Sequence, residues 1–393
     1  MKEAILTINA GSSSIKFALF PLAHPISPEA EVSGQIDGIG TSATKMVAKN
    51  RAGEKIADQL IAGEKVSHDT AFDALLKWFQ ATQADWQIVA AGHRVVHGGE
   101  RYSAPTLIDT TVLEHLTSFI PLAPLHEPHN VAGIKALQAL LPAVPQIACF
   151  DTAFHRSQPD VAQAFGLPRA LSAEGIKRYG FHGLSYEYIA RALPEHSHRA
   201  NGRVIVAHLG NGASMSAMVN RKCVATTLGF STIDGLMMGT RCGALDPGVI
   251  LHLMETKSLS VKDMTKMLYK ESGLLGVSGI SQDMRTLLAS DKPEAQQAVD
   301  LFCYRIVREL GSLVAAAGGI DALVFTGGIG EHAAEVRRRV CLQSEWTGLR
   351  LDPEANARHD IVISAGNSSV DVLVIPTNEE WMMAHHAQTL LAL

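Results

Sequence analysis

The chain has 393 residues, of which 47% are hydrophobic and 19% are charged, and it carries a formal net charge of −5. A single hydrophobic core seldom serves more than about 250 to 300 residues, so this length predicts two domains with a cleft between them. The slightly acidic balance excludes a broad electrostatic attraction to nucleic acid or to an anionic membrane.

The cysteines and the N-terminus indicate a cytoplasmic protein. The five cysteines are widely spaced and form no CxxC pair, which argues against a disulfide framework and against a thiolate zinc site. The first apolar run follows directly after Lys2 and Glu3 and is interrupted by Asn9, so it is too short for a signal sequence. No run reaches the roughly 18 apolar residues that a membrane span needs.

The first part of the chain is expected to contain strands followed by helices. Residues 1–90 read mostly as strands and glycine-rich turns, with clear alternation in "SIKFALF". Apolar residues between 72 and 79 have helical spacing, and "WQIVAAGHRVV" then has the composition of a buried strand. Helices are expected at about 110–120 and 130–141, followed by a strand, "PQIACF", that ends at Asp151.

A second cycle begins near residue 203. The stretch "RVIVAHLGNGASMSAMV" repeats the opening order of apolar strand, small polar turn and alternating strand, which indicates an internal duplication. Helices are expected over 246–318, among them one with Ser260 and Asp263 spaced as a capping box and a long one from Pro293. "DALVFTGGIGEH" then predicts a strand running into a helix, and "VDVLVIPTNEE" predicts a last strand before a final helix. Strands that alternate with helices predict an α/β fold.

Four strand ends carry glycine or serine clusters: "NAGSSS", "HLGNGAS", "FTGGIGE" and "GLMMGTRCG". Glycine lets the backbone approach a ligand closely, so that consecutive N–H groups can converge on phosphate oxygens. Neither the P-loop motif nor the Rossmann motif is present. One such cluster usually marks only a turn, but several in a duplicated chain indicate a nucleotide site divided between two lobes.

Eight motifs occur in order along the whole chain: "NAGSSSIKF", "GHRVVHGGE", "FDTAFH", "YGFHGLS", "HLGNGAS", "GTRCG..DP", "FTGGIGE" and "PTNEE". Together they resemble the acetate kinase family of carboxylate kinases, within the superfamily of acetate and sugar kinases, heat-shock chaperones and actin. The resemblance implies an α/β fold of two duplicated ribonuclease H-like lobes, as in actin-like ATPases, each a mixed β-sheet with helices. The implied N-terminal lobe is 1–150 with 380–393 returning to it, and the C-terminal nucleotide-binding lobe is 151–379, with the nucleotide cleft between them. A homodimer is implied as well.

The implied reaction is the reversible, ATP-dependent phosphorylation of acetate, or of another short carboxylate such as propionate, by direct in-line transfer with Mg²⁺ or with Mn²⁺ in its place. A carboxylate has a pKa of about 4 to 5 and is already ionised at neutral pH, so the reaction needs no strong base. It needs positive charge that lets two anions approach and that stabilises a loose transition state. One methylene is worth only about 1 to 3 kcal/mol in a pocket, so acetate and propionate are both expected substrates.

The resemblance assigns catalytic roles to four residues. Arg94 would bind the carboxylate or phosphoryl oxygens, while Arg241 and His182 would stabilise the transferring group. Asp151 would orient an arginine or a magnesium-bound water rather than act as a base. The residues alone leave structural alternatives open: the arginines could form surface ion pairs, His182 could be a capping or packed histidine, and Asp151 could cap a turn.

The resemblance also implies the binding residues. Magnesium would be held by Asn9 and Glu379, or by Glu380 if the register shifts by one residue. The contacts of the acyl group would be Arg94, Val96, Leu125, His126, Phe181 and Thr232. The phosphate contacts would be Ser12, Ser14, Lys16, His208, Leu209, Gly210, Asn211 and Gly212. The nucleoside contacts would be Asp283, Met284, Arg285, Gly328, Ile329, Gly330, Glu331 and His332.

Three positions depart from the pattern of the family. Thr232 stands where proline is usual in the acyl pocket, His332 where asparagine is usual after "GIGE", and Ala244 where aspartate is usual near Arg241. These departures concern the acyl preference, the nucleoside contacts and the packing around Arg241. None removes a charge that the transfer needs.

Other functions compete with this interpretation, the nearest being a kinase that prefers propionate or butyrate. The histidine pairs His93/His97 and His126/His129 suggest zinc, but a spacing of four does not converge on a strand, and Pro128 interrupts the second pair. A related kinase or phosphatase acting on a hydroxyl or a polyphosphate would use Asp151 as a base and a larger polar pocket. A nucleotide-dependent switch without catalysis would bind nucleotide but transfer nothing.

Overall fold

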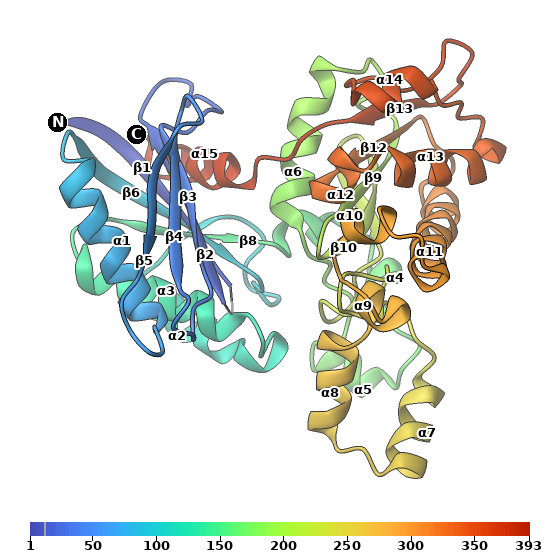
Figure 1. Ribbon diagram of the computed structural model, residues 1–393, viewed down its shortest axis with the longest axis horizontal. Coiled ribbons are helices and arrows are strands. Elements are labelled where there is room, and N and C mark those ends of the chain that lie inside the picture. The colour runs from blue at the N-terminus through green and yellow to red at the C-terminus, as the bar shows by residue number, and fades with distance from the viewer. Residues whose placement is uncertain (12) are drawn as a thin grey trace. The chain divides into compact units, whose positions relative to one another are not determined.

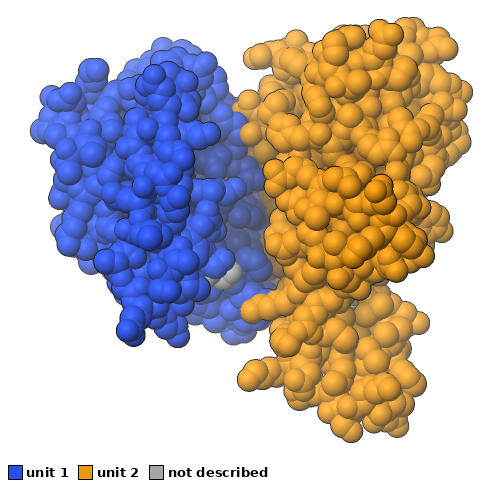
Figure 2. Space-filling view, in the orientation of Figure 1, with its two compact units in different colours: residues 1–154, 378–393 blue, residues 155–377 orange. Residues whose placement is uncertain are grey.

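The computed structural model describes residues 1–11 and 13–393. The chain divides into two compact units, which Figure 2 shows in different colours: unit 1 is Met1–Phe154 with Asn378–Leu393, and unit 2 is His155–Thr377. The boundaries expected from the sequence were 150/151 and 379/380. Asp151 and Glu379, which those boundaries gave to the C-terminal lobe, therefore lie in unit 1.

Unit 1 is built on one eight-stranded sheet of order β5-β4-β3-β2-β1-β6-β8-β7 (Figure 1). Its strands are β1 (Lys2–Ala10), β2 (Ser14–Pro21), β3 (Val32–Asp37), β4 (Lys45–Asn50), β5 (Lys55–Leu60), β6 (Trp86–Val95), β7 (Thr106–Leu107) and β8 (Gln146–Phe150). Its helices are α1 (His68–Thr82), α2 (Thr110–Ser118), α3 (Glu127–Leu140) and α15 (Glu379–Leu391).

Alternation along β1 and β2 assigns each residue to one face of this sheet. Leu6 and Ile8 on β1, with Ile15 and Phe17 on β2, belong to the apolar core that also contains Phe72 of α1. The residues between them, among which are the expected site residues of these strands, therefore point to the opposite face. On that face α15 packs against β1 and β6. The sheet is thus buried on both sides near its centre.

Local sequence signals explain where the helices begin and end. The side chain of Ser67 accepts a hydrogen bond from the N–H of Thr70 at the start of α1. The expected capping box is confirmed, because Ser260 and Asp263 bond reciprocally at the start of α8 (Val261–Lys270). The long helix α11 (Pro293–Ala317) is capped by Gly318, whose φ of 74° is left-handed and suits glycine.

Unit 2 contains a five-stranded sheet of order β11-β10-β9-β12-β13. Its strands are β9 (Arg203–Leu209), β10 (Ala213–Val219), β11 (Lys222–Thr226), β12 (Ala322–Thr326) and β13 (Asp371–Val374). Its helices are α4 (Asp160–Gln163), α5 (Arg169–Ala173), α6 (Gly183–Ala192), α7 (Pro247–Lys257), α8 (Val261–Lys270), α9 (Gly273–Ser278), α10 (Met284–Leu288), α11 (Pro293–Ala317), α12 (Gly327–His332), α13 (Ala334–Gln343) and α14 (Pro353–Arg358).

The two sheets share one topology. In unit 2, β11, β10 and β9 pair antiparallel, and β9, β12 and β13 pair parallel. In unit 1, β3, β2 and β1 pair antiparallel, and β1, β6 and β8 pair parallel. The duplication indicated by the two glycine and serine hairpins is therefore confirmed for the central five strands. Unit 1 adds β4 and β5 at one edge and β7 at the other.

Within the described ranges 1–11 and 13–393, no helix has both the length and the apolar character needed to cross a membrane.

Candidate active site

One candidate cluster lies at the carboxyl ends of β1, β6 and β8 in unit 1. These strands are parallel neighbours, so their last residues meet at one edge of the sheet. Arg94 is the penultimate residue of β6, and Asp151 directly follows β8. The Arg94 Nε donates to Asp151 Oδ1 at 3.0 Å and Nη2 donates to Oδ2 at 2.5 Å, which makes a bidentate pair. The carboxylate is only 1% exposed, so this is not a surface ion pair.

Asn9, Lys16 and Glu379 surround this pair on the same side of the sheet. Strand register places Asn9 opposite Lys16 across β1 and β2. Arg94 Nη1 donates to Asn9 Oδ1 at 3.3 Å. Glu379 is the first residue of α15, which packs on β6 at Gly92, where a Cβ would lie 3.0 Å from the carbonyl oxygen of Met383. Only glycine allows this close approach of helix and strand.

The charges of this cluster influence one another strongly. Burial disfavours the charged form of Arg94, but Asp151 and Glu379 outweigh it and raise the pKa of the guanidinium. Burial also raises the pKa of Glu379 to about 7; Arg94 opposes this shift, whereas the negative charges of Asp151 and Glu380 add to it. A half-buried carboxyl group with one cation and further carboxylates beside it is suited to receive a second cation.

The residues of this cluster fit a magnesium ion. The amide oxygen of Asn9 and the carboxylate of Glu379 are hard oxygen ligands of the kind that Mg²⁺ takes. Glu380, the alternative in the sequence, lies next along α15 and lines the cavity beside Lys16, and its charge acts on Arg94 less strongly than that of Glu379. The structure therefore favours Glu379 as the residue facing Arg94.

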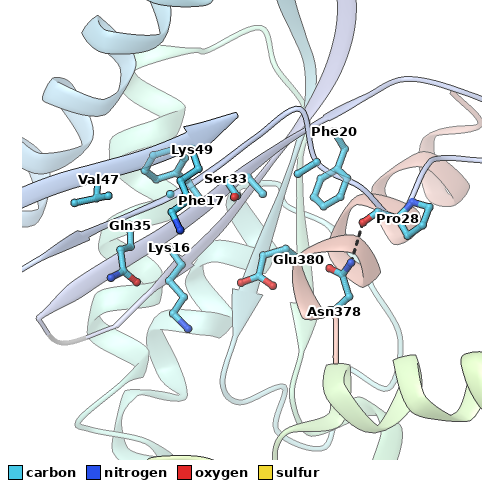
Figure 3. A pocket seen from close by; sticks show the side chains of 13 residues that line it. Lys16, Phe17, Phe20, Pro28, Ser33, Gln35, Val47, Lys49, Asn378 and Glu380 are labelled. Atoms are coloured by element: carbon cyan, nitrogen blue, oxygen red, sulfur yellow. Dashed lines mark hydrogen bonds between the residues drawn. The ribbon is translucent and has the colours of Figure 1, made fainter. Parts of the chain in front are cut away.

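A cavity of about 510 Å³ adjoins Lys16 in unit 1 (Figure 3). Figure 3 shows Lys16 and Gln35 on the strands of the sheet, with Glu380 and Asn378 at the start of α15. The Asn378 amide donates to the carbonyl of Pro28 at 2.9 Å, which joins this end of α15 to the loop after β2. Lys16 is exposed and its charge acts on Glu379, so it is available to an anion on this face.

Two side chains of α3 hold the segment that follows β6. Asn130 Oδ1 accepts from the N–H of Val96 at 3.0 Å, and Glu127 Oε2 accepts from the N–H of His97 at 3.3 Å. Both α3 side chains are buried. Of the expected acyl contacts, Val96 is buried here, and Leu125 and His126 immediately precede α3 in the same unit. Phe181 and Thr232 belong to unit 2.

Another candidate cluster lies in unit 2, around the turn between β9 and β10. A Cβ on Gly212 would lie 3.2 Å from His182 Nε2 and 3.4 Å from Arg241 Nη2. Two nitrogen groups of the expected catalytic set therefore converge on one glycine of the expected phosphate turn. The missing side chain leaves room in which an anion can be held between them.

Backbone and ring contacts fix these two side chains. Arg241 Nη1 donates to the carbonyl of Thr232 at 2.6 Å. His182 has a left-handed φ of 60° at the start of α6, and its ring stacks on His208 with 4.4 Å between the centroids. A left-handed backbone is unfavourable for a residue with a side chain, and such residues gather at functional sites. The helix-capping alternative for His182 finds no side-chain capping bond.

A cavity of about 380 Å³ in unit 2 collects most of the expected nucleoside contacts. It lies between the β9–β10 turn, the start of α10 and the glycine-rich helix α12. Arg285 pairs with Asp283, and this hydrogen bond lowers the pKa of Asp283 to about 2. The lining residues expected from the sequence are Gly210, Asn211, Asp283, Met284, Arg285, Gly328, Ile329 and His332, and those not expected are Gln282, Leu288 and Ala333.

Some expected nucleotide contacts have other surroundings. Ser12 lies outside the described residues, and Ser14 begins β2 with its carbonyl accepting from the N–H of Gly11. Leu209 is fully buried and can offer only its backbone. Glu331 Oε1 accepts from the N–H groups of Gly327 and Thr377, so it supports the start of α12. Gly330 is buried within the same helix.

The histidine pairs have separate environments. His93 is fully buried and burial lowers its pKa to about 4, while His97 Nδ1 accepts from the N–H of Gly99. His126 precedes α3 and His129 stacks on His68. Pro128 does not kink the pair, because it occupies the first turn of α3. The residues described contain no group of three or more metal-binding side chains of the His, Cys, Asp and Glu types.

Sequence reasoning missed the residues that hold the site together. Ser214 was quoted within "HLGNGAS" but received no role, although its hydroxyl contacts His182 Nδ1 at 2.8 Å. Glu127, Asn130 and Arg337 had no motif to mark them, and their importance comes from burial and long-range hydrogen bonds. Of these residues, only Ser214 could have been recognised from the sequence, through its spacing from the glycines of its turn.

The chain is similar to known proteins over its full length. The model of the Acetokinase family matches residues 4–385. An acetate kinase of Rhodopseudomonas palustris is 54% identical over 392 residues, with 98% of each chain covered. Among solved structures, a propionate kinase from Francisella tularensis matches with a TM-score of 0.91 and 37% identity, covering 98% of this chain and 99% of that one. An acetate kinase from Porphyromonas gingivalis matches with a TM-score of 0.88 and 35% identity, covering 99% and 100%.

Proposed function

This chain belongs to the acetokinase family, and we propose that it phosphorylates acetate or another short carboxylate with ATP, reversibly and by direct in-line transfer. The observation that carries the proposal is the convergence of His182 Nε2 and Arg241 Nη2 on Gly212, in a unit that also has a cavity lined by the expected nucleoside contacts. The Arg94–Asp151 pair of unit 1 supports it with a half-buried cation for the carboxylate.

The chemistry follows from these groups. An oxygen of the ionised carboxylate forms a bond to the γ-phosphorus as the bond from that phosphorus to the oxygen of ADP breaks, and no proton needs to move. Arg94 binds and orients the acceptor, and Asp151 fixes the plane of its guanidinium through two hydrogen bonds. His182 and Arg241 stabilise the charge on the transferring phosphoryl oxygens.

Asn9 and Glu379 would hold magnesium, which neutralises phosphate charge when it is bound. Lys16 adds a cation near the same carboxylate. The nucleotide phosphates would also contact the β9–β10 turn from His208 to Gly212, and the nucleoside would occupy the cavity between α10 and α12.

The substrate range is proposed to include both acetate and propionate. The relatives named above include acetate kinases and a propionate kinase. The acyl group would be surrounded by Val96, Leu125, Phe181 and Thr232. Thr232 stands where proline is usual, and its backbone carbonyl accepts a hydrogen bond from Arg241. We further propose a cytoplasmic homodimer. The five free cysteines support a reducing compartment.

Trapping with hydroxylamine tests this function, because acyl phosphate is converted to a coloured hydroxamate whereas a phosphorylated hydroxyl is not. The purified chain with ATP, Mg²⁺ and acetate or propionate should give hydroxamate. Asp151→Asn should lower kcat by about 100-fold or more with a small change in the KM for acetate, because an amide cannot hold Arg94 by two charge-assisted bonds. ATP binding without hydroxamate in the wild-type chain would support the switch instead, and near-normal turnover of Asp151→Asn would remove that residue from the site.

A further inference from the structure

In unit 2, the imidazole of His182 begins a chain of hydrogen-bonded groups that continues through the hydroxyls of Ser214 and Tyr186. His182 Nδ1 is 2.8 Å from Ser214 Oγ, and Ser214 Oγ is 2.6 Å from the hydroxyl of Tyr186. Ser214 lies on β10, while His182 and Tyr186 lie one helical turn apart at the start of α6. Ser214 and Tyr186 are both fully buried. The two elements are thus joined by polar groups that water does not reach.

The two nitrogens of His182 have different surroundings. Nδ1 faces Ser214, whereas Nε2 is the atom that, like Arg241 Nη2, lies near the position of a Cβ on Gly212. A neutral imidazole carries its proton on one nitrogen only, and the partner of the other nitrogen decides which one. To stabilise an anionic phosphoryl group, the nitrogen on the Gly212 side must be the donor.

We propose that Ser214 and Tyr186 are positioning residues that set the tautomer and the ring plane of His182. The Tyr186 hydroxyl donates to Ser214 Oγ, and the Ser214 hydroxyl donates to His182 Nδ1, which leaves the proton of the imidazole on Nε2. This is the one direction of the chain in which each hydroxyl donates once and Nε2 is a donor to the transferring group. The inference rests on the proposed function, since it concerns the step in which His182 meets the phosphoryl oxygens.

The surrounding packing makes a positioning role necessary. His182 has a left-handed backbone at the first turn of α6, so its side chain is not held by a regular helical environment. Stacking on His208 restrains the tilt of the imidazole ring but does not prevent a ring flip that would exchange the positions of Nδ1 and Nε2. The hydrogen bond to Ser214 removes this second freedom. His208 is restrained in the same manner by Ser185, whose hydroxyl is 2.8 Å from its Nδ1.

The chain offers a matched control on the same strand. Ser216 is two residues along β10, so its side chain projects from the same face, and it is equally buried. Its hydroxyl instead bonds to Cys223 and to the carbonyl of Ala225. Ser216→Ala therefore removes one buried serine hydroxyl from β10 without touching His182.

Steady-state kinetics of the hydroxamate reaction provide the test. Ser214→Ala should lower kcat about tenfold, the worth of one hydrogen bond, with both KM values changed less than twofold. Tyr186→Phe should lower kcat by a smaller factor, and Ser216→Ala should keep the wild-type kcat. Because a buried alanine could also disturb the fold, Ser214→Ala is repeated in a His182→Ala background, where it should cause no further loss.

The outcomes separate the two proposals. A wild-type chain that forms no acyl phosphate overturns the proposed function and the inference with it. An active wild type with Ser214→Ala equal to Ser216→Ala overturns the inference alone. A loss for Ser214→Ala of the same factor with and without His182 also overturns it, because the serine would then act on the fold rather than through the imidazole.

Discussion

At the scale of single residues, buried charges set the properties of the site. Arg94 is held by Asp151 on one side and influenced by Glu379 on another, so the orientation of the guanidinium is fixed before substrate arrives. Such preorganisation avoids a reorganisation cost during the reaction. Glu127 is a second buried carboxyl group of unit 1, and it has no arginine. Burial raises its pKa to about 8, and the charge of Asp151 contributes to the shift.

The raised pKa of Glu127 predicts a pH-dependent stability. The folded chain binds this proton more tightly than the unfolded chain, where the pKa is near 4.5. The stability that the protonated group contributes is therefore fully present below about pH 4.5 and is lost as the pH rises through about 8. We expect Glu127→Gln, which still offers an oxygen to the N–H of His97, to remove this loss.

The measurement is urea unfolding of both chains at pH 5.5, 7 and 8.5. The difference in unfolding free energy between variant and wild type should grow in favour of the variant as the pH rises. The buried histidines His93 and His155, whose pKa values are lowered to about 4, also make the stability depend on pH. Their contribution is the same in both chains and cancels in the difference. A difference that stays constant over this range would contradict a proton on Glu127.

At the scale of secondary-structure elements, α12 is a short glycine-rich helix that needs support from outside. Arg337 of α13 supplies it: Nη1 donates to the carbonyls of Gly330 and Glu331 at 2.8 Å each, and Nε donates to Asn356 Oδ1 at 2.7 Å. Arg337 is fully buried, and burial lowers its pKa to about 10. Glycine lowers helix propensity by about 1 kcal/mol, so these bonds matter for the cavity that α12 lines.

Arg337→Met tests this support, because it keeps an unbranched side chain and removes all the donors. The backbone carbonyls of Gly330, Glu331 and Asn356 then lose a buried partner, so the unfolding free energy should fall by about 2 to 4 kcal/mol. The KM for ATP should rise several-fold, with the KM for acetate little changed. Arg338→Met is the control, since Arg338 is half-exposed and pairs only with Glu335 among its described contacts. Equal thermal midpoints and equal ATP KM values in the two variants would contradict the role.

At the scale of the whole molecule, the duplicated sheet places one hairpin turn of each unit at equivalent positions of the topology. One region has no counterpart in the duplication: α7 and α8 lie apart from the sheet of unit 2 (Figure 1). None of the residues of α7 is buried, and its apolar side chains include Val249, which is 40% exposed, and Leu251, which is 67% exposed. Helices with this much apolar surface are normally covered.

The proposed homodimer predicts that a second copy covers this helix. A two-fold interface brings one patch against itself, and Glu255 and Lys257 of α7 give this patch both signs of charge, which can pair between the copies. Leu251→Glu should therefore reduce the mass measured by light scattering after size exclusion from two chains to one. Val161→Glu is the control, because Val161 is an exposed apolar residue on α4. An unchanged mass for Leu251→Glu would place the interface elsewhere.

The sequence by itself determined the α/β class, the duplicated strand–turn–strand pattern and the family, because these depend on periodicity and on motifs that are local in the chain. Its motifs also predict catalytic roles for Arg94, Asp151, His182 and Arg241. The tertiary structure decided what surrounds them. Glu127 and Arg337 carry no sequence signal because a hydrogen bond between residues on different elements depends on packing, as does the burial that shifts a pKa. The serine behind His182 belongs to the same class: its turn was visible in the sequence, but strand register and a left-handed residue on α6 bring its hydroxyl to the imidazole.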